Sequence, residues 1–373
     1  MDDPGNPLSA NGDTTQRNLK YLNDALFGLW SYGSNALVGW TPSPRGLEII
    51  SVPMVRLYRD GNAHRRVFIG DRIMGKATFH DVARALTVEP MELRLEHPIG
   101  DRPNEINAAA VDRLFSQFAV TKTRQRGVFL IDAVGFSLFS PEEQASQLAA
   151  LEFALNIADE TARRCSVIVA MARSTTGDGF YVWNEEKGPE ADLRLLCVFV
   201  LTMTYLSALR RAMGDVSYVP KIRSCYGVGS HYSYHHSENS RRGGLDYIVG
   251  DVTISLARLI DKAKPGQILI SEFSRKIDDT GQVLKTPEFL SAAVTMMDGF
   301  RELEIMGSRI RQASIYLTGP RQPDSEKRIQ RLKVTDKHGL AHYCYNAKVS
   351  VVPEDEEPIQ SGLEHDELRG GVS

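Results

Sequence analysis

Two aspartates occupy turns that could hold a divalent cation. Asp132 follows the apolar run 128–131 and precedes a glycine turn, and Asp178 lies in a second glycine turn between two apolar segments. A short continuous apolar run predicts a strand that is buried on both faces. A carboxylate at the end of such a strand needs a partner, although an aspartate can also simply cap its turn. Because two facing carboxylates repel each other without a cation, a metal site explains the pair better than packing does.

The segments around these turns predict an α+β fold with a ferredoxin-like βαββαβ core. Ser140, Pro141 and Glu143 form a capping-box pattern that starts a helix after the first strand. The expected order is strand 128–131, helix from 141, strands 166–171 and 180–183, helix 192–213, strand 222–228, helix 251–262 and strand 267–271. A hairpin of 301–305 and 313–317 follows.

Four stretches of this core resemble the catalytic domain of class III nucleotidyl cyclases, in the family's order: 129–137, 176–179, 250–259 and 264–271. The resemblance implies conversion of a nucleoside triphosphate to a 3′,5′-cyclic nucleotide and pyrophosphate at the interface of a head-to-tail homodimer. It implies two cations per site, Mg²⁺ or Mn²⁺, with Asp132 and Asp178 as ligands and the backbone carbonyl of Ala133 assisting. It also implies that Arg258 reaches the reacting phosphate and ribose from the opposite subunit.

The chain departs from the family at the positions that bind phosphate. Ile254 replaces an asparagine one helical turn before Arg258, and Met306 replaces a lysine that holds the triphosphate. Arg309 and Arg311 could supply the lost charge, but exposed arginines on a hairpin are more often plain surface. Arg258 itself could instead form an ion pair with Asp261 or Glu272, which follow it in the sequence.

The base-reading positions also differ. Ser174 replaces the purine-reading lysine, with Arg173 beside it, and Tyr247 replaces the second base reader, with Asp246 adjacent. These substrate-binding candidates suit a smaller base, such as a pyrimidine. An alternative is a catalytically degenerate domain that binds a nucleotide or only dimerises and regulates another activity. A third interpretation is a structural protein in which the aspartate turns are coincidental.

The polar loop 229–237 contains three histidines and two tyrosines, which could bind a transition metal or stack on a base: His231, Tyr232, Tyr234, His235 and His236. No carboxylate or cysteine joins them at ligand spacing, so an ordinary polar loop is the favoured interpretation.

Length and composition set the remaining expectations. A chain of 373 residues predicts two folded units, and a net charge of −3 gives no bias toward nucleic acid. Four scattered cysteines fit a reducing cytoplasm, and the apolar run 195–209 predicts a buried core helix rather than a membrane span. The expected organisation is a disordered lead 1–18, an accessory regulatory α/β module 19–105, a connecting helix 106–121, a catalytic domain 122–320, an extension 321–353 and an acidic disordered tail 354–373. Within the module, strands 54–58 and 67–69 are expected to flank a hairpin turn at Asp60-Gly61, and within the extension, residues 339–352 are expected to form one or two strands that could cap a sheet edge.

Overall fold

The computed structural model describes residues 7–59, 72–100, 105–214, 216–235, 246–277, 281–301, 303–320 and 329–369. The chain forms two compact units, one of Met1–Thr123 with Tyr232–Ile248 and one of Arg124–His231 with Val249–Ser373. Both units combine helices with antiparallel strands, so the predicted α+β class is confirmed.

The first unit is a three-stranded antiparallel sheet covered by helices on both faces. Its elements are α1 (Pro7–Trp30), η1 (Ser31–Gly33), β1 (Asn35–Ser43), β2 (Gly46–Pro53), α2 (Met54–Arg59), α4 (Lys76–Leu86), β3 (Met91–Arg94) and α5 (Ala108–Ser116). Trp40 of β1 packs in one apolar cluster with Leu26 of α1 and Phe115 of α5. Val38, also on β1, packs in a second cluster with Phe79 of α4.

Two expectations for this unit are wrong. The lead 1–18 was expected to be disordered, but α1 begins at Pro7. Leu22 and Leu26 lie one turn apart and are buried, and the helix that they anchor extends back through the polar residues before them. Residues 54–58 form α2 instead of a strand. The predicted Asp60-Gly61 turn and the strand 67–69 lie outside the described residues.

The second unit is built on one large sheet. Its elements are β4 (Thr121–Ala133), η2 (Phe136–Leu138), α6 (Pro141–Arg164), β5 (Met171–Thr175), β6 (Gly179–Asn184), α7 (Pro189–Met213), β7 (Ile222–His235), α8 (Asp251–Ile260), β9 (Ile268–Ser271), β10 (Ser274–Lys276), β11 (Val283–Lys285), α9 (Thr286–Met297), η4 (Asp298–Phe300), β12 (Glu304–Ile305), β13 (Ser308–Leu317), β14 (Arg331–Thr335), β15 (Ala341–Pro353), β16 (Ile359–Ser361) and α10 (His365–Arg369). The strand β8 (Asp246–Val249) follows β7 in the chain, and its residues up to Ile248 are grouped with the first unit. The sheet order is β12-β13-β15-β9-β7-β4-β6-β5, with β8 paired to β7 and β14 and β16 paired to β15.

The βαββαβ order is therefore present as β4, α6, β5, β6, α7 and β7. The predicted strand 166–171 is shifted, because the strand before the Asp178 turn is β5, Met171–Thr175. The capping box of α6 is confirmed: the Glu143 amide donates to Ser140 Oγ and the Ser140 amide donates to Glu143 Oε2.

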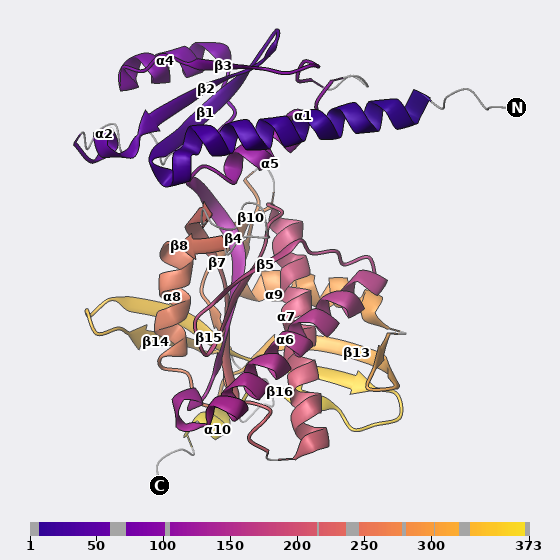
Figure 1. Ribbon diagram of the computed structural model, residues 1–373. Coiled ribbons are helices and arrows are strands. Elements are labelled where there is room, and N and C mark those ends of the chain that lie inside the picture. The colour runs from indigo at the N-terminus through magenta and orange to yellow at the C-terminus, as the bar shows by residue number, and fades with distance from the viewer. Residues whose placement is uncertain are drawn as a thin grey trace, which may run out of the picture. The chain divides into compact units, whose positions relative to one another are not determined.

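Helices lie on both faces of this sheet, with α6 and α7 on one side and α8 on the other (Figure 1). Phe129 and Ile131 of β4 pack into the large cluster formed with α6, α7 and α9. Side chains alternate along a strand, so Asp132 lies on the opposite face, the face of α8. Among the described residues, α7 is the one helix long and apolar enough to cross a membrane, but 78% of its apolar window is buried within the protein.

The C-terminal part belongs to the sheet, which corrects two expectations. Residues 321–353 were expected to form a separate extension, at most capping a sheet edge, yet β15 is an interior strand between β13 and β9. The tail from 354 was expected to be disordered, yet it contains β16, and Ser361 donates a hydrogen bond to the Met203 carbonyl of α7. Apolar side chains such as Ile359, which is buried, explain why this acidic segment folds back.

Candidate functional site

Strand pairing brings the two predicted aspartates together. In the antiparallel pair of β4 and β6, Asp132 is opposite Gly179, and the Ala133 amide donates to the Asp178 carbonyl at 3.0 Å. The Thr176 hydroxyl donates to Asp178 Oδ1 at 3.2 Å, which holds that side chain in its turn. A side chain at Gly179 would place its Cβ 1.9 Å from the Ile131 carbonyl oxygen, so the close approach of the two strands requires glycine.

An arginine that the sequence interpretation missed completes this arrangement. Arg223, on β7, donates from Nε to Asp132 Oδ2 at 2.6 Å. Its neighbours Ile222 and Ser224 face α7, so the alternation of β7 places Arg223 on the face of Asp132. That alternation was readable from the sequence, and a ferredoxin-like core places its first and last strands, here β4 and β7, side by side, but the sequence interpretation did not extend this to Arg223.

The charges of Asp178 and Arg223 both act on Asp132. Burial raises the pKa of Asp132 above its ordinary value, the hydrogen bond and charge of Arg223 oppose that shift, and the nearby Asp178 carboxylate adds to it. The influence of Asp178 means that the two negative charges lie close enough to repel each other.

This donor set fits Mg²⁺ or Mn²⁺. Both ions prefer oxygen ligands, and Mg²⁺ in particular is commonly held by one or two carboxylates together with substrate phosphates and water. The described residues contain no group of three or more His, Cys, Asp and Glu side chains suited to a metal. Asp132, Asp178 and the carbonyl of Ala133 are oxygen donors at this place that could hold such an ion together with phosphate oxygens.

The helix α8 lies on the same face of the sheet as Asp132. The Tyr181 hydroxyl of β6 donates to the Thr253 carbonyl of α8 at 3.1 Å, and burial raises the pKa of Tyr181 to about 12. Arg258, in the last turn of α8, has two carboxylates within ion-pair range: Asp336 Oδ2 is 3.6 Å from its Nε and Asp261 Oδ2 is 3.9 Å from its Nη1. The suggested partner Glu272 is instead held by Arg331.

The residues at and beside the positions that depart from the cyclase family have different surroundings. Ile254, one turn before Arg258, is 50% exposed. Ser174 is buried on β5 opposite Tyr181, on the face of Asp132. Arg173 is directed to the other face, where it pairs with Glu152 of α6 at 2.7 Å, so it does not stand in for the missing lysine beside Ser174.

The remaining candidates do not join the aspartates in the described structure. Tyr247 is 45% exposed and belongs to the first unit, as does Asp246, whose side chain lies outside the described residues. Met306 occupies the β12–β13 turn with φ +53° and is 51% exposed. Arg309 and Arg311 are exposed on β13.

The histidine loop is only partly described. His231 is fully buried in β7, which does not suit a surface metal loop. His236 and the side chains of Tyr234 and His235 lie outside the described residues, so the transition-metal interpretation stays a prediction.

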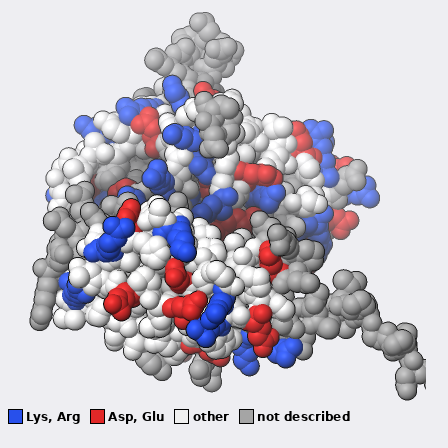
Figure 2. Space-filling view, turned by 90° about the horizontal axis from the view of Figure 1, so that it is seen from above, with Lys and Arg blue, Asp and Glu red and all other residues white. Residues whose placement is uncertain are grey.

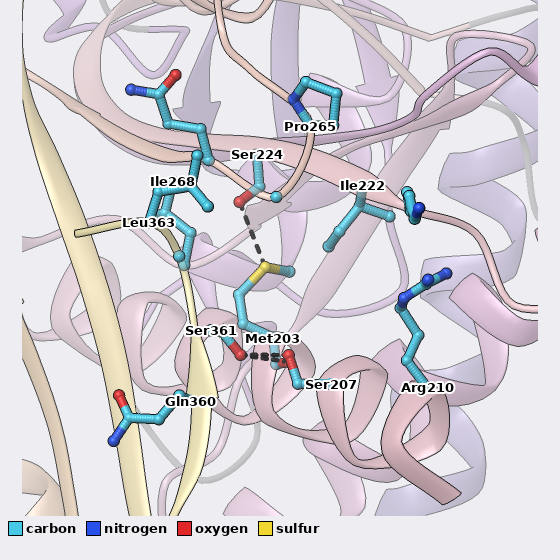
Figure 3. A pocket seen from close by; sticks show the side chains of 14 residues that line it. Met203, Ser207, Arg210, Ile222, Ser224, Pro265, Ile268, Gln360, Ser361 and Leu363 are labelled. Atoms are coloured by element: carbon cyan, nitrogen blue, oxygen red, sulfur yellow. Dashed lines mark hydrogen bonds between the residues drawn. The ribbon is translucent and has the colours of Figure 1, made fainter. Parts of the chain in front are cut away.

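A cavity of about 420 Å³ lies on the opposite face of the sheet from Asp132. Figure 3 shows it between α7, the start of β7 and the C-terminal segment, with Met203, Ile222 and Leu363 among its walls. Two of its three lining serines, Ser207 and Ser361, hydrogen-bond each other at 2.6 Å, and Arg210 donates to the Val219 carbonyl.

The described residues on the face in Figure 2 form no single-sign charged patch. On the face shown in Figure 2, basic and acidic side chains are interspersed. This agrees with the overall charge of −3.

Comparison with known proteins finds a likeness of fold only. No family model matches the chain, and no curated protein is similar to it in sequence. The guanylate cyclase domain of RhGC from Catenaria anguillulae, solved with GTP, is 16% identical, covering 62% of this chain and 98% of that one, with a TM-score of 0.36. The adenylyl cyclase CyaB from P. aeruginosa is 15% identical over 63% of this chain and 97% of that one, with a TM-score of 0.36. A dimeric guanylyl cyclase domain of the RhoGC fusion protein from Blastocladiella emersonii is 14% identical over 60% and 96%, with a TM-score of 0.35. These likenesses are too distant to assign a role to any residue of this chain.

Proposed function

We propose that this protein is a nucleotidyl cyclase that converts a nucleoside triphosphate to a 3′,5′-cyclic nucleotide and pyrophosphate in the cytoplasm. In the reaction the ribose 3′-oxygen bonds to the α-phosphorus, the bond from that phosphorus to the oxygen that bridges it to the β-phosphorus breaks, and that oxygen leaves with pyrophosphate while the 3′-hydroxyl proton passes to solvent. The observation that carries the proposal is the proximity of the Asp132 and Asp178 carboxylates where β4 pairs with β6, with Arg223 bound to Asp132.

The residues of this group have complementary tasks. Asp132, Asp178 and the Ala133 carbonyl would hold two divalent cations, which would supply acidification of the 3′-hydroxyl and neutralisation of charge on the phosphates. Arg223 balances the charge of Asp132 when no cation is present, because its Nε lies 2.6 Å from Oδ2. Once the carboxylate has another partner, the same guanidinium can turn to a phosphate oxygen, for which its planar donors are well suited.

The proposed active form is a homodimer. Val249, the last residue of β8, and Ile254 of α8 are 56% and 50% exposed. Exposed apolar side chains next to a functional face are typical of surfaces that pair with another molecule. A second copy related by a two-fold axis would cover both and bring its Arg258 to the first copy's aspartates, which would create two composite sites.

Base selectivity is proposed to differ from that of purine cyclases. Ser174, beside Tyr181, offers a short hydroxyl where a long cationic side chain would be needed to reach a purine edge. Tyr247, at the second base-reading position, has a bulky side chain that is proposed to reduce the room for the base. A pyrimidine triphosphate is therefore the proposed substrate.

A second candidate function is a degenerate cyclase-like domain that binds nucleotide without turnover. It is favoured by the exposed Ile254 and Met306, because neither side chain can donate a hydrogen bond to phosphate. Loss of one such donor commonly costs about 10² to 10³ in rate.

Incubation of the purified protein with ATP, GTP, CTP and UTP separately, with Mg²⁺ or Mn²⁺, tests the proposal when products are resolved by mass. The expected result is a cyclic pyrimidine nucleotide that disappears in Asp132→Asn and Asp178→Asn. Nucleotide binding without any cyclic product, in a folded dimer, would replace the proposal with the degenerate domain.

A further inference from the structure

The turn between β14 and β15 places a carboxylate against Arg258. This five-residue turn, 336–340, comes from the C-terminal part of the chain, which the cyclase resemblance does not cover. Its first residue, Asp336, has a side chain only 3% exposed. Asp336 Oδ2 is 3.6 Å from Arg258 Nε and 3.5 Å from His342 Nε2.

The two oxygens of Asp336 have different surroundings. Oδ1 accepts hydrogen bonds from the backbone amides of His338 and Leu340, at 2.8 Å and 2.9 Å. Desolvation opposes ionisation of this carboxyl, but those amides and His342 outweigh it and lower the pKa. The turn therefore fixes Oδ1 and directs a charged Oδ2 at the guanidinium of Arg258.

The guanidinium keeps capacity for another ligand. Its Nε is buried, and no described atom lies within hydrogen-bond distance of it, since Asp336 Oδ2 at 3.6 Å is an ion-pair neighbour only. Asp261, the other carboxylate in range, is 61% exposed and therefore screened by solvent. Asp336 is thus the buried carboxylate that faces the Nε of Arg258, and that Nε keeps its capacity for a hydrogen bond.

We infer that Asp336 is a positioning residue for Arg258, so that the C-terminal hairpin contributes to catalysis although it does not touch substrate. This inference rests on the proposed function, because it assigns Asp336 a role through an arginine that meets the phosphate. A turn-forming role alone is the competing explanation, since an aspartate whose Oδ1 accepts two backbone amides stabilises such a turn anyway.

Asp336→Asn separates the two explanations. Asparagine retains an oxygen for the amides of His338 and Leu340, but replaces the charged oxygen facing Arg258 with an NH₂ group. The turn is kept and the ion pair is lost. Lys337→Ala, an exposed change in the same turn, is the matched control.

The experiment measures kcat, KM and the unfolding temperature with the triphosphate that the wild-type protein turns over, for Asp336→Asn, Arg258→Ala, the double variant and Lys337→Ala. We expect Asp336→Asn to lower kcat about tenfold with KM and unfolding temperature little changed, as for residues that share one network. In the Arg258→Ala background the same change should lower kcat no further, and Lys337→Ala should match the wild type.

The outcomes keep the inference separate from the proposed function. An active wild type with an unaffected or faster Asp336→Asn variant overturns the inference and leaves the cyclase proposal standing. Equal losses in both backgrounds also overturn it, because Asp336 would then act independently of Arg258. An inactive wild type that is folded and dimeric refutes the proposed function, and the positioning role with it.

Discussion

Arg223 Nε and Asp132 Oδ2 are 2.6 Å apart, which joins β7 to the end of β4 on the face opposite the main core. The ion pair places a positive charge beside the two proposed metal ligands. A cation that binds Asp132 competes with this arginine, so the strength of the pair affects both stability and metal affinity.

Arg223→Met should lower the free energy of unfolding of the metal-free protein and increase the stabilisation that an added divalent cation gives. Asp132 is 10% exposed and Arg223 is 28% exposed, so the loss is expected to be about 1–2 kcal/mol, between surface and fully buried pairs. Without the arginine, the repulsion between Asp132 and Asp178 is relieved only by an added cation. Urea unfolding with and without Mn²⁺ checks this: Mn²⁺ should stabilise the variant more than the wild type. An equal effect on both proteins would show that Arg223 does not compete with the cation.

The buried ion pair of Asp192 and Arg275 stabilises the second unit away from the candidate site. Asp192 of α7 is fully buried, accepts from Arg275 Nε at 2.6 Å and from the Gly127 amide at 2.6 Å, and thereby joins α7 to β4 and β10. Asp192→Ala leaves Arg275 and that amide buried without their acceptor. We expect a loss of about 3–5 kcal/mol in the free energy of unfolding.

Denaturant unfolding of Asp192→Ala measures this loss. Glu160→Ala is a suitable control, because Glu160 and its partner Arg164 on α6 are 61% and 62% exposed and such pairs contribute about 0–1 kcal/mol. Similar losses in the two variants would contradict a special role for the buried pair.

The amino-acid sequence predicts the site's local parts better than their assembly. Periodicity and the capping box identify α6, and the Asp132 and Asp178 turns follow from glycines next to apolar runs. Arg223 could not be found in this way, because its contact depends on β7 lying beside β4 in the sheet. The interior position of β15 could not be predicted either, because the pairing of strands that are distant in the sequence leaves no local pattern. The acidic residues after β15 also resemble a disordered tail.

Stability should fall in acid partly through Glu272, which anchors the hairpin that carries Asp336. Arg331 donates two hydrogen bonds to Glu272 and lies over the Tyr343 ring at 3.6 Å. The hydrogen bond from Arg331 lowers the pKa of Glu272 below its ordinary value of 4.5. Since the folded-state pKa is lower than the unfolded one, this pair stabilises the protein above pH 4.5 and the contribution is lost as the pH falls through the folded-state pKa.

Glu272→Gln tests that dependence. The wild type should be more stable than the variant near pH 7, and the difference should shrink as the pH falls below about 4.5, where the wild-type carboxyl also becomes neutral. Urea unfolding between pH 3 and pH 7 measures it. A difference that stays constant across this range would mean that the charge of Glu272 contributes nothing.

Gly179→Ala should disrupt the proposed metal site without touching either aspartate. The added Cβ would lie 1.9 Å from the Ile131 carbonyl oxygen and 3.0 Å from the Asp132 Cα, so β4 and β6 must separate where their register brings Asp132 and Asp178 together. A change that forces backbone to shift belongs with severely destabilising substitutions, and we expect a loss of about 3 kcal/mol or more.

Gly299→Ala in the same unit is the matched control, because nothing lies within 4 Å of its added Cβ. Unfolding experiments should place this control near the wild type. At a temperature where both variants remain folded, Gly179→Ala should lose cyclic-nucleotide formation and the control should retain it. If Gly179→Ala is as active as the control, the close approach of β4 and β6 is not what aligns the two carboxylates, and the proposed metal site has to be placed elsewhere.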